Sequence, residues 1–441
     1  MRFWKKAERA NTNSSHSKGV ESILDASSNH EQLSSPTDLP VELLANILSY
    51  VGEYNYIYTA GTCHTLKKAL AINTSDKKTK LSNVVSSISC TKLYINEVGA
   101  RNSDQILLLL KAAVENGKMD IIHFLDAKYE WEQSVKRGDK GIELCRIAAK
   151  NGNLKILKFL YTNGFSWESR VASLAAEHGH LDILQFAHEN SCPWKPDVCF
   201  KAAAAGNFDC LVYAHEHGCP WNARTCIAAA EAGHFDILKW AKSKNCPWDS
   251  FIAVRAAAGG NLHIVQWCLE NGCDWSNIIA SEAAAAGHLH ILSWATEKHM
   301  LSTENDVMVC ANAARCNQFE VLKWARENNY GWNALTTTFA ARSGNLDMLK
   351  WIVDNGCPMN IMTCIEACEM GHFSILKWAH VEKKMDLDSR CCAAAALSGD
   401  IEVLKYLRQN DCKWDIRTTY NAKLKGNNAI LEYAVRNGCP C

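Results

Sequence analysis

The amino-acid sequence predicts an all-α fold, a helix-turn-helix solenoid of repeats, preceded by a small helical segment. Three observations predict it. The chain of 441 residues is 48% hydrophobic and contains only 8 Pro, which favours long runs of helix. A glycine followed by Asn or His recurs along the chain, in most steps every 27 residues. Around each copy the apolar residues follow helical spacing, and a fixed period of this kind is the signature of a solenoid.

Residues 1–36 precede the predicted helices and are rich in Ser, Asn and charged residues, so we expect a disordered tail. The first residues are positively charged but lack the apolar core of a secretion signal, and no 18-residue apolar run follows elsewhere. The 21 Cys are therefore expected to stay reduced in an intracellular setting, cytoplasmic or nuclear, without a membrane partner.

Residues 37–75 begin with a capped amphipathic helix. Thr37 or Asp38 can cap it, and Pro40 lies in its first turn. Its leucine-rich string and a later Cys-His-x-Leu resemble an F-box, the module that docks a chain onto the Skp1-type adaptor of cullin–RING ubiquitin ligases. The resemblance implies docking by six residues: Leu39, Pro40, Leu43, Leu44, Ile47 and Leu48. The alternative is a helical segment that only caps the first repeat.

Residues 76–103 are a connector or a degenerate repeat, and residues 104–441 hold about twelve copies of the repeat. One longer step contains an insertion at residues 133–141. The Gly-Asn or Gly-His copies begin at Gly152, Gly179, Gly206, Gly233, Gly260, Gly287, Gly344 and Gly371, and degenerate copies lie at Gly117, Cys316, Gly399 and Gly426.

The copy at residues 225–248 illustrates the expected unit. An Ala-rich helix ends at Gly233, which adopts the left-handed conformation cheaply, and the alanines at 228–230 let neighbouring helices approach closely. The second helix, FDILKWAKSKN, is apolar over a wide arc, so it must be covered on both sides by neighbouring repeats. Pro247 in the following Cys-Pro-Trp stops the helix.

These motifs resemble ankyrin repeats. The carrying features are A-A-x-x-G-H/N-L/F-D-I-L-K, as at residues 203–211, 229–239 and 340–350, and N-G-C at 271–273 and 355–357. The ankyrin period is about 33 residues, so each copy here is shorter by about six. The missing residues correspond to the β-turn finger of that family, and we therefore expect a nearly all-helical solenoid with short loops.

Three recurrent residue types invite a functional interpretation, and each is better explained by structure. Equivalent Cys in stacked repeats are expected about 10 Å apart and no C-x-x-C occurs, which argues for burial and against metal binding. His alternates with Asn directly after the repeat glycine, which indicates hydrogen bonding at the turn or at the start of the second helix. The Trp rows lie at fixed places in the repeat and are expected to pack between repeats.

Catalysis and nucleic-acid binding are not expected. No catalytic motif, no phosphate loop and no cofactor site is recognisable, so the chain is predicted not to be an enzyme. Lys+Arg and Asp+Glu balance at 47 each, and this neutrality argues against a nucleic-acid partner.

Recognition is expected at positions that change from copy to copy, after Cys-Pro-Trp and at the start of the first helix, although such change also occurs on a solvated surface. This partner-binding zone comprises Lys195, Asp197, Arg224, Phe251, Arg255, Asn277, Glu282, Leu335, Met362 and Arg417. Its mixed character suits a protein partner. Two functions remain open: a substrate adaptor of an SCF-type ubiquitin ligase, or a scaffold without a ubiquitin role.

Overall fold

In the computed structural model, residues 103–129, 131, 133–300 and 306–441 are described, together with Ile88, Thr91, Lys92 and Ile95. The predicted tail, the F-box-like segment at 37–75 and its six docking residues lie outside these ranges. The chain divides into two compact units. Unit 1 comprises Met1–Ala148 and Lys155–Ser166, and unit 2 comprises Ala149–Leu154 and Trp167–Cys441.

The described part of the chain is all-helical, with 25 helices and no strand, as the sequence predicts. Apart from α10 these helices follow one another in twelve pairs. Their bounds are α8 Ser103–Glu115, α9 Met119–Lys128, α10 Gln133–Arg137, α11 Asp139–Lys150, α12 Leu154–Thr162, α13 Ser169–Glu177, α14 Leu181–Glu189, α15 Asp197–Ala205, α16 Phe208–Glu216, α17 Ala223–Ala232, α18 Phe235–Ser243, α19 Phe251–Ala258, α20 Leu262–Glu270, α21 Asn277–Ala286, α22 Leu289–Glu297, α23 Met308–Arg315, α24 Phe319–Glu327, α25 Ala334–Ser343, α26 Leu346–Asp354, α27 Ile361–Glu369, α28 Phe373–Val381, α29 Ser389–Ser398, α30 Ile401–Gln409, α31 Ile416–Lys425 and α32 Asn428–Arg436.

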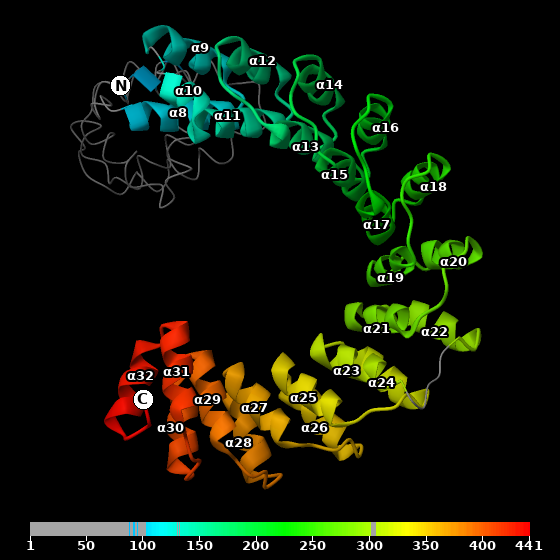
Figure 1. Ribbon diagram of the computed structural model, residues 1–441, viewed down its shortest axis with the longest axis vertical. Helices are drawn as coiled ribbons and strands as arrows, with labels where there is room; N and C mark the ends of the chain where they lie inside the picture. Colours follow the sequence, from blue (N-terminus) through cyan, green and yellow to red (C-terminus); the bar gives the residue numbers. More distant parts are fainter. Residues whose placement is uncertain are drawn as a thin grey trace, which may run out of the picture. The chain divides into compact units, whose positions relative to one another are not determined.

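The helices of unit 2 form two layers (Figure 1). The odd-numbered first helices α13 to α31 pack extensively against their successors, and each also packs against the second helix of its own pair. Successive second helices touch one another little. Unit 2 therefore curves with its first helices on the inner side, because small buried residues such as Ala229 and Ala283 let those helices approach closely.

A turn residue in the left-handed conformation separates the two helices of each pair in unit 2. Gly233 has φ 84°, which a residue without Cβ adopts cheaply. In the degenerate copy that the sequence assigns to Cys316, the residue with positive φ is its neighbour Asn317 (φ 59°), so this copy is one residue out of step with the prediction. The insertion at 133–141 is helical over most of its length, since it forms α10 and the start of α11.

Candidate functional site: the inner face of the first helices

Hydrogen bonds join neighbouring repeats at their turns. In several repeats the side chain of the residue after the turn residue reaches back to the preceding repeat. Asn261 Nδ2 donates to the carbonyl oxygens of Ala230 and Glu231, both at 2.9 Å, at the end of α17. His288 Nε2 makes the same connection to the carbonyl oxygen of Ala258 at 3.0 Å. The sequence predicts hydrogen bonding at the turn or at the start of the second helix for this His/Asn position. For Asn261 and His288 the partners are instead the last carbonyls of the preceding first helix, whereas Asn345 does bond at its own helix start.

The same side chain explains why the turn residue is glycine. A Cβ added to Gly233 would lie 2.8 Å from Asn261 Oδ1, and one added to Gly260 would lie 2.7 Å from His288 Cε1. The turn glycine thus leaves room for the residue that ties the next repeat in place. The need for this space explains why a turn glycine recurs together with a His or Asn one repeat later.

The cysteines of the repeat are buried and hold a second set of connections. Cys246 Sγ donates to the carbonyl oxygen of Asn222 at 3.6 Å, and Cys412 Sγ donates to that of Asp388 at 3.1 Å, each 24 residues earlier. Burial raises the pKa of the Cys192 thiol to about 11, so this thiol stays protonated and able to donate at neutral pH. Of the described cysteines, only Cys441 is exposed.

The expectation that sulfurs lie far apart applies only to equivalent positions. Non-equivalent cysteines do meet: Cys392 Sγ of α29 lies 3.5 Å from Cys412 Sγ in the loop after α30. Within the described ranges, no group of three or more His, Cys, Asp or Glu side chains has the arrangement of a metal site.

The tryptophans pack within and between repeats, as the sequence predicts. Trp221, in the loop before α17, meets Trp240 of α18 edge-on, with ring centroids 5.7 Å apart, and His215 of α16 stacks on Trp221 at 4.0 Å. Phe208 of α16 contacts Trp240 at 5.5 Å. These aromatic contacts involve second helices and the loops before first helices, so they leave the inner side of the first helices to other residues.

The partner-binding zone predicted from the sequence gathers on one row of that inner side. Six of its ten residues occupy the position nine residues before the turn residue, at the first or second residue of a first helix. They are Asp197, Arg224, Phe251, Leu335, Met362 and Arg417. Arg255 and Glu282 lie four residues further along their helices and therefore on the same face, whereas Lys195 and Asn277 lie one or two residues before the row.

Sequence reasoning missed four members of this row: the apolar Ile278 and Met308, and the basic Arg170 and Arg390. The side chains of Ile278 and Met308 are 55% and 41% exposed, and they occupy the same repeat position as Phe251, which is 49% exposed. Aligning the copies on the turn residue would have found Ile278 beside the predicted Asn277. Met308 was obscured because the step from Gly287 to Asn317 is 30 residues and not 27.

Capping interactions hold the backbone of the row. Asn333 Oδ1 accepts a hydrogen bond from the backbone N–H of Leu335 at 2.9 Å, and Asn360 Oδ1 does the same for Met362 at 3.0 Å. Because the cap satisfies the backbone N–H, the helix start is fixed while the side chain two residues after the cap projects outward.

A second row on the inner side consists of ion pairs that join neighbouring repeats. Lys201 pairs with Glu177 at 2.9 Å, and Arg342 pairs with Glu366 at 2.7 Å. Arg255 Nε donates to Glu231 Oε2 at 3.1 Å, a bond that raises the pKa of the guanidinium. These cations are thus matched by carboxylates of the adjacent repeat.

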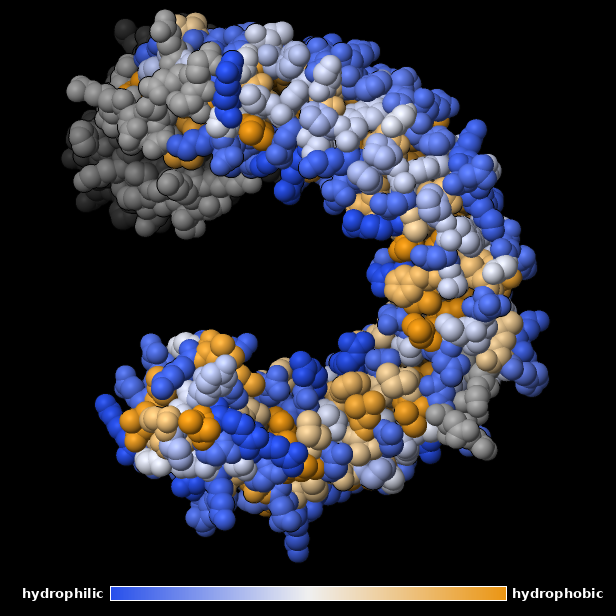
Figure 2. All heavy atoms as spheres, viewed as in Figure 1, coloured by the Kyte–Doolittle hydropathy of each residue, from blue (hydrophilic) through white to orange (hydrophobic). Residues whose placement is uncertain are grey.

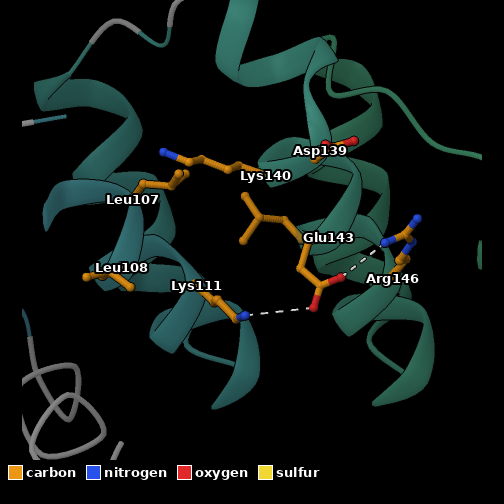
Figure 3. Close-up of a pocket in the computed structure, with 8 residues that line it drawn as sticks. Leu107, Leu108, Lys111, Asp139, Lys140, Glu143 and Arg146 are labelled. Atoms are coloured by element: carbon orange, nitrogen blue, oxygen red, sulfur yellow. Dashed lines mark hydrogen bonds and ion pairs between the residues drawn. The ribbon is translucent and has the colours of Figure 1, made fainter. Parts of the chain in front are cut away.

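In unit 1, a cavity of about 530 Å³ lies between α8 and α11 (Figure 3). Its lining residues are Leu107, Leu108, Lys111, Asp139, Lys140, Glu143, Leu144 and Arg146. The Glu143 carboxylate lies 3.7 Å from Lys111 Nζ and 3.4 Å from an Arg146 guanidinium nitrogen. A carboxylate that already pairs with two cations, next to leucines, indicates no particular ligand. We therefore assign no function to this cavity.

Solved structures of helical-repeat proteins are similar to the chain at low TM-scores. No protein-family model matches the chain, and no curated protein matches it. Among solved structures, the pentatricopeptide repeat protein PPR10 in complex with an 18-nt psaJ RNA element is 12% identical, with a TM-score of 0.35, over 90% of this chain and 67% of that one. PPR10 from maize gives a TM-score of 0.30 over 93% of this chain and 79% of that one, again at 12% identity. The human ASB11 ankyrin repeat domain is 15% identical with a TM-score of 0.18, over 48% of this chain and 84% of that one.

The comparison corrects one prediction. A nucleic-acid partner is not expected from the sequence, because the net charge is zero and the tryptophans are predicted to pack between repeats. That exclusion is wrong as a general argument, because two of the similar helical-repeat structures are complexes with RNA. Net charge describes the whole chain and not one face. At this level of similarity the comparison concerns the helical-repeat fold, and it confirms neither the ankyrin type nor the F-box-like segment. No helix in the described ranges has the length and apolar character that crossing a bilayer requires.

Proposed function

We propose that the chain is a non-enzymatic scaffold that binds a protein partner on the inner side of its first helices. One observation carries the proposal. The residue nine positions before the turn residue changes between acidic, basic, aromatic and aliphatic from repeat to repeat, and its side chain projects outward. The frame around it is buried and repeats almost unchanged. A solenoid that keeps its frame and varies one projecting row is organised for recognition.

The polar groups of the frame support a binding role over a catalytic one. The recurrent His and Asn side chains bond to backbone carbonyls, and the inner charges pair with one another. The proposed setting is intracellular, where the many buried thiols would stay reduced.

A substrate adaptor of an SCF-type ubiquitin ligase is a more specific form of this function, and it rests on the F-box-like sequence at residues 37–75. In that case the solenoid would raise the effective concentration of a bound protein near the ligase. Co-purification of the full chain with a Skp1-type adaptor tests this form. Binding that is lost in a folded Leu43→Asp/Leu44→Asp variant would support it, and no binding by the intact chain would leave the plain scaffold.

Selection of ligands on the full chain tests the proposed function itself. A library of displayed random peptides and a pool of random single-stranded RNA would be panned in parallel. We expect a peptide consensus that loses binding to an Ile278→Asp/Leu335→Asp variant. The matched variant is Val381→Asp/Val435→Asp, which alters exposed apolar residues (58% and 48% exposed) of second helices and should bind as well as the unmodified chain. The proposal is refuted if no peptide consensus emerges, if only RNA is enriched, or if both variants bind equally.

A further inference from the structure

The row nine residues before the turn residue is apolar in five consecutive repeats. This apolar row consists of Phe251, Ile278, Met308, Leu335 and Met362. Four of its members are exposed, at 49%, 55%, 41% and 37%, while Leu335 is half-buried. Figure 2 shows hydrophobic residues gathered over α19 and α21, where the row begins. Large exposed apolar side chains aligned in this way mark an interaction surface.

Charged residues occupy the same position in the repeats on both sides of the row. Arg224 precedes it, with its guanidinium 4.6 Å from the ring centroid of Phe200. Arg390 follows it and is bound by Asp388, with a nitrogen–oxygen distance of 2.7 Å. The apolar row is therefore a bounded segment five repeats long.

Three cations near the apolar row have partners within the protein, two of them carboxylates. Arg255 is paired with Glu231 and Arg342 with Glu366. Arg315 Nε donates to Asn312 Oδ1 at 3.1 Å. To bind these cations, the phosphates of an RNA backbone would have to displace their present acceptors. That exchange is unfavourable because the two displaced carboxylates, of Glu231 and Glu366, would lie close to the phosphates. An uncharged apolar ligand needs no such exchange, so the electrostatics of the row favour a protein segment over RNA.

The spacing of the row specifies the conformation of that segment. Packed helices lie about 8–10 Å apart, so equivalent side chains on neighbouring first helices repeat at about that distance. A polyproline II segment advances about 3.1 Å per residue with three residues per turn, which returns every third side chain to one face after about 9.3 Å. An α-helix advances about 1.5 Å per residue and would be straight against a curved row.

We infer that the apolar row docks an extended, uncharged protein segment with an apolar side chain at every third residue, one for each of the five repeats. The inference rests on the proposed function and adds the class of ligand. Because the caps at Asn333 and Asn360 fix the helix starts, the row binds with little reordering of its backbone.

Fluorescence anisotropy with synthetic peptides and the full chain tests the inference. The probe is a fluorescein-labelled 17-residue peptide with five Leu at every third position, separated by Ser, Gln and Thr. A control peptide has the same composition with Leu at every second position, and a labelled oligouridine of equal length is the RNA arm. We expect the first peptide to bind at least tenfold more tightly than either control.

Variants connect the binding to the row. Ile278→Asp/Leu335→Asp should weaken binding of the every-third-Leu peptide at least tenfold, whereas Val381→Asp/Val435→Asp should leave its binding unchanged. Circular dichroism verifies that both variants remain helical. Equal binding of both peptides, tighter binding of oligouridine, or equal losses in the two variants would overturn the inference. If the every-third-Leu peptide fails while selected peptides bind in a row-dependent manner, the inference falls and the proposed function stands. If selection fails as well, both fall.

Discussion

The direction of the Asn261 hydrogen bonds gives a sharp test of how repeats are joined. Asn261 directly follows Gly260, the turn residue of its repeat. Its Nδ2 donates to the carbonyl oxygens of Ala230 and Glu231 in the preceding repeat. An Asn261→Asp substitution keeps the size and shape of the side chain but replaces this donor by a carboxylate oxygen. The variant therefore removes both bonds and places a negative charge at the C-terminal end of α17.

The magnitude follows from these contacts. Two hydrogen bonds at about 0.5–1.5 kcal/mol each amount to about 1–3 kcal/mol. Repulsion by the negative end of the α17 dipole adds about 0.3–1 kcal/mol. Capping of the N-terminus of α20 by the new carboxylate offsets a similar amount, up to about 1 kcal/mol. The expected net loss is about 2 kcal/mol for opening the interface between this repeat and the preceding one.

Hydrogen exchange measured by mass spectrometry on peptides of α17 and α20 reports this local opening. Since about 1.4 kcal/mol is a factor of ten, we expect exchange on the order of 30-fold faster in the variant.

Asn222→Asp, at the start of α17, is the matched control, because Asn222 Oδ1 accepts from the backbone N–H of Arg224 at 3.0 Å and a carboxylate also accepts. Its exchange should change by less than about threefold, since the cap is retained. Unchanged exchange in Asn261→Asp, or equal acceleration in both variants, would refute the account of the repeat connection.

Three further predictions concern the frame. Gly233→Ala should lower the stability of its repeat by about 2–4 kcal/mol, because φ is 84° and the new Cβ would displace the Asn261 side chain. Gly272→Ala, where φ is 94° and no atom lies within 4 Å of the new Cβ, should cost about 1–2 kcal/mol from backbone strain alone, and thermal unfolding of the two variants measures the difference. A hydrogen bond from Arg417 lowers the pKa of Asp415 to about 2, so the stabilisation by this ion pair is present above pH 4 and is lost as the pH falls toward 2. Urea unfolding at several pH values should show that stability depends less on acid pH in Asp415→Asn, a variant that keeps the helix cap. Limiting iodoacetamide should modify Cys441 first among the described cysteines, and mass spectrometry that finds a buried thiol modified first would contradict the assigned burial.

The fold could be predicted from the sequence because its main constraint is local and repeated. A glycine able to adopt positive φ, alanines that allow close approach and an apolar second helix recur in step, so each copy supports the prediction from the others. The partner of the His/Asn position could not be predicted, because Asn261 bonds to residues 30 and 31 positions earlier. No local pattern distinguishes that contact from a cap of its own helix.

The candidate site was only partly predictable for a related reason. The variable row was visible at Phe251 and Met362, where the copies keep their 27-residue step. Its continuity through Ile278 and Met308 needed the turn residue of each copy to be known, and one of these is Asn317 rather than a glycine. The ion-pair row was hidden for the same reason as the Asn261 contact, since Arg342 and Glu366 are 24 residues apart.

Site-specific photo-crosslinking tests most directly the claim that the inner side of the first helices binds the partner. Benzoylphenylalanine would replace Ile278 on the apolar row or, in a second sample, Val381 on a second helix; the two side chains are exposed to a similar degree, 55% and 58%. Each labelled chain would be irradiated with a peptide recovered by selection. The account predicts crosslinks from position 278 that unlabelled peptide competes away, and none from position 381. Crosslinks from position 381 alone, or from both positions equally, would contradict it.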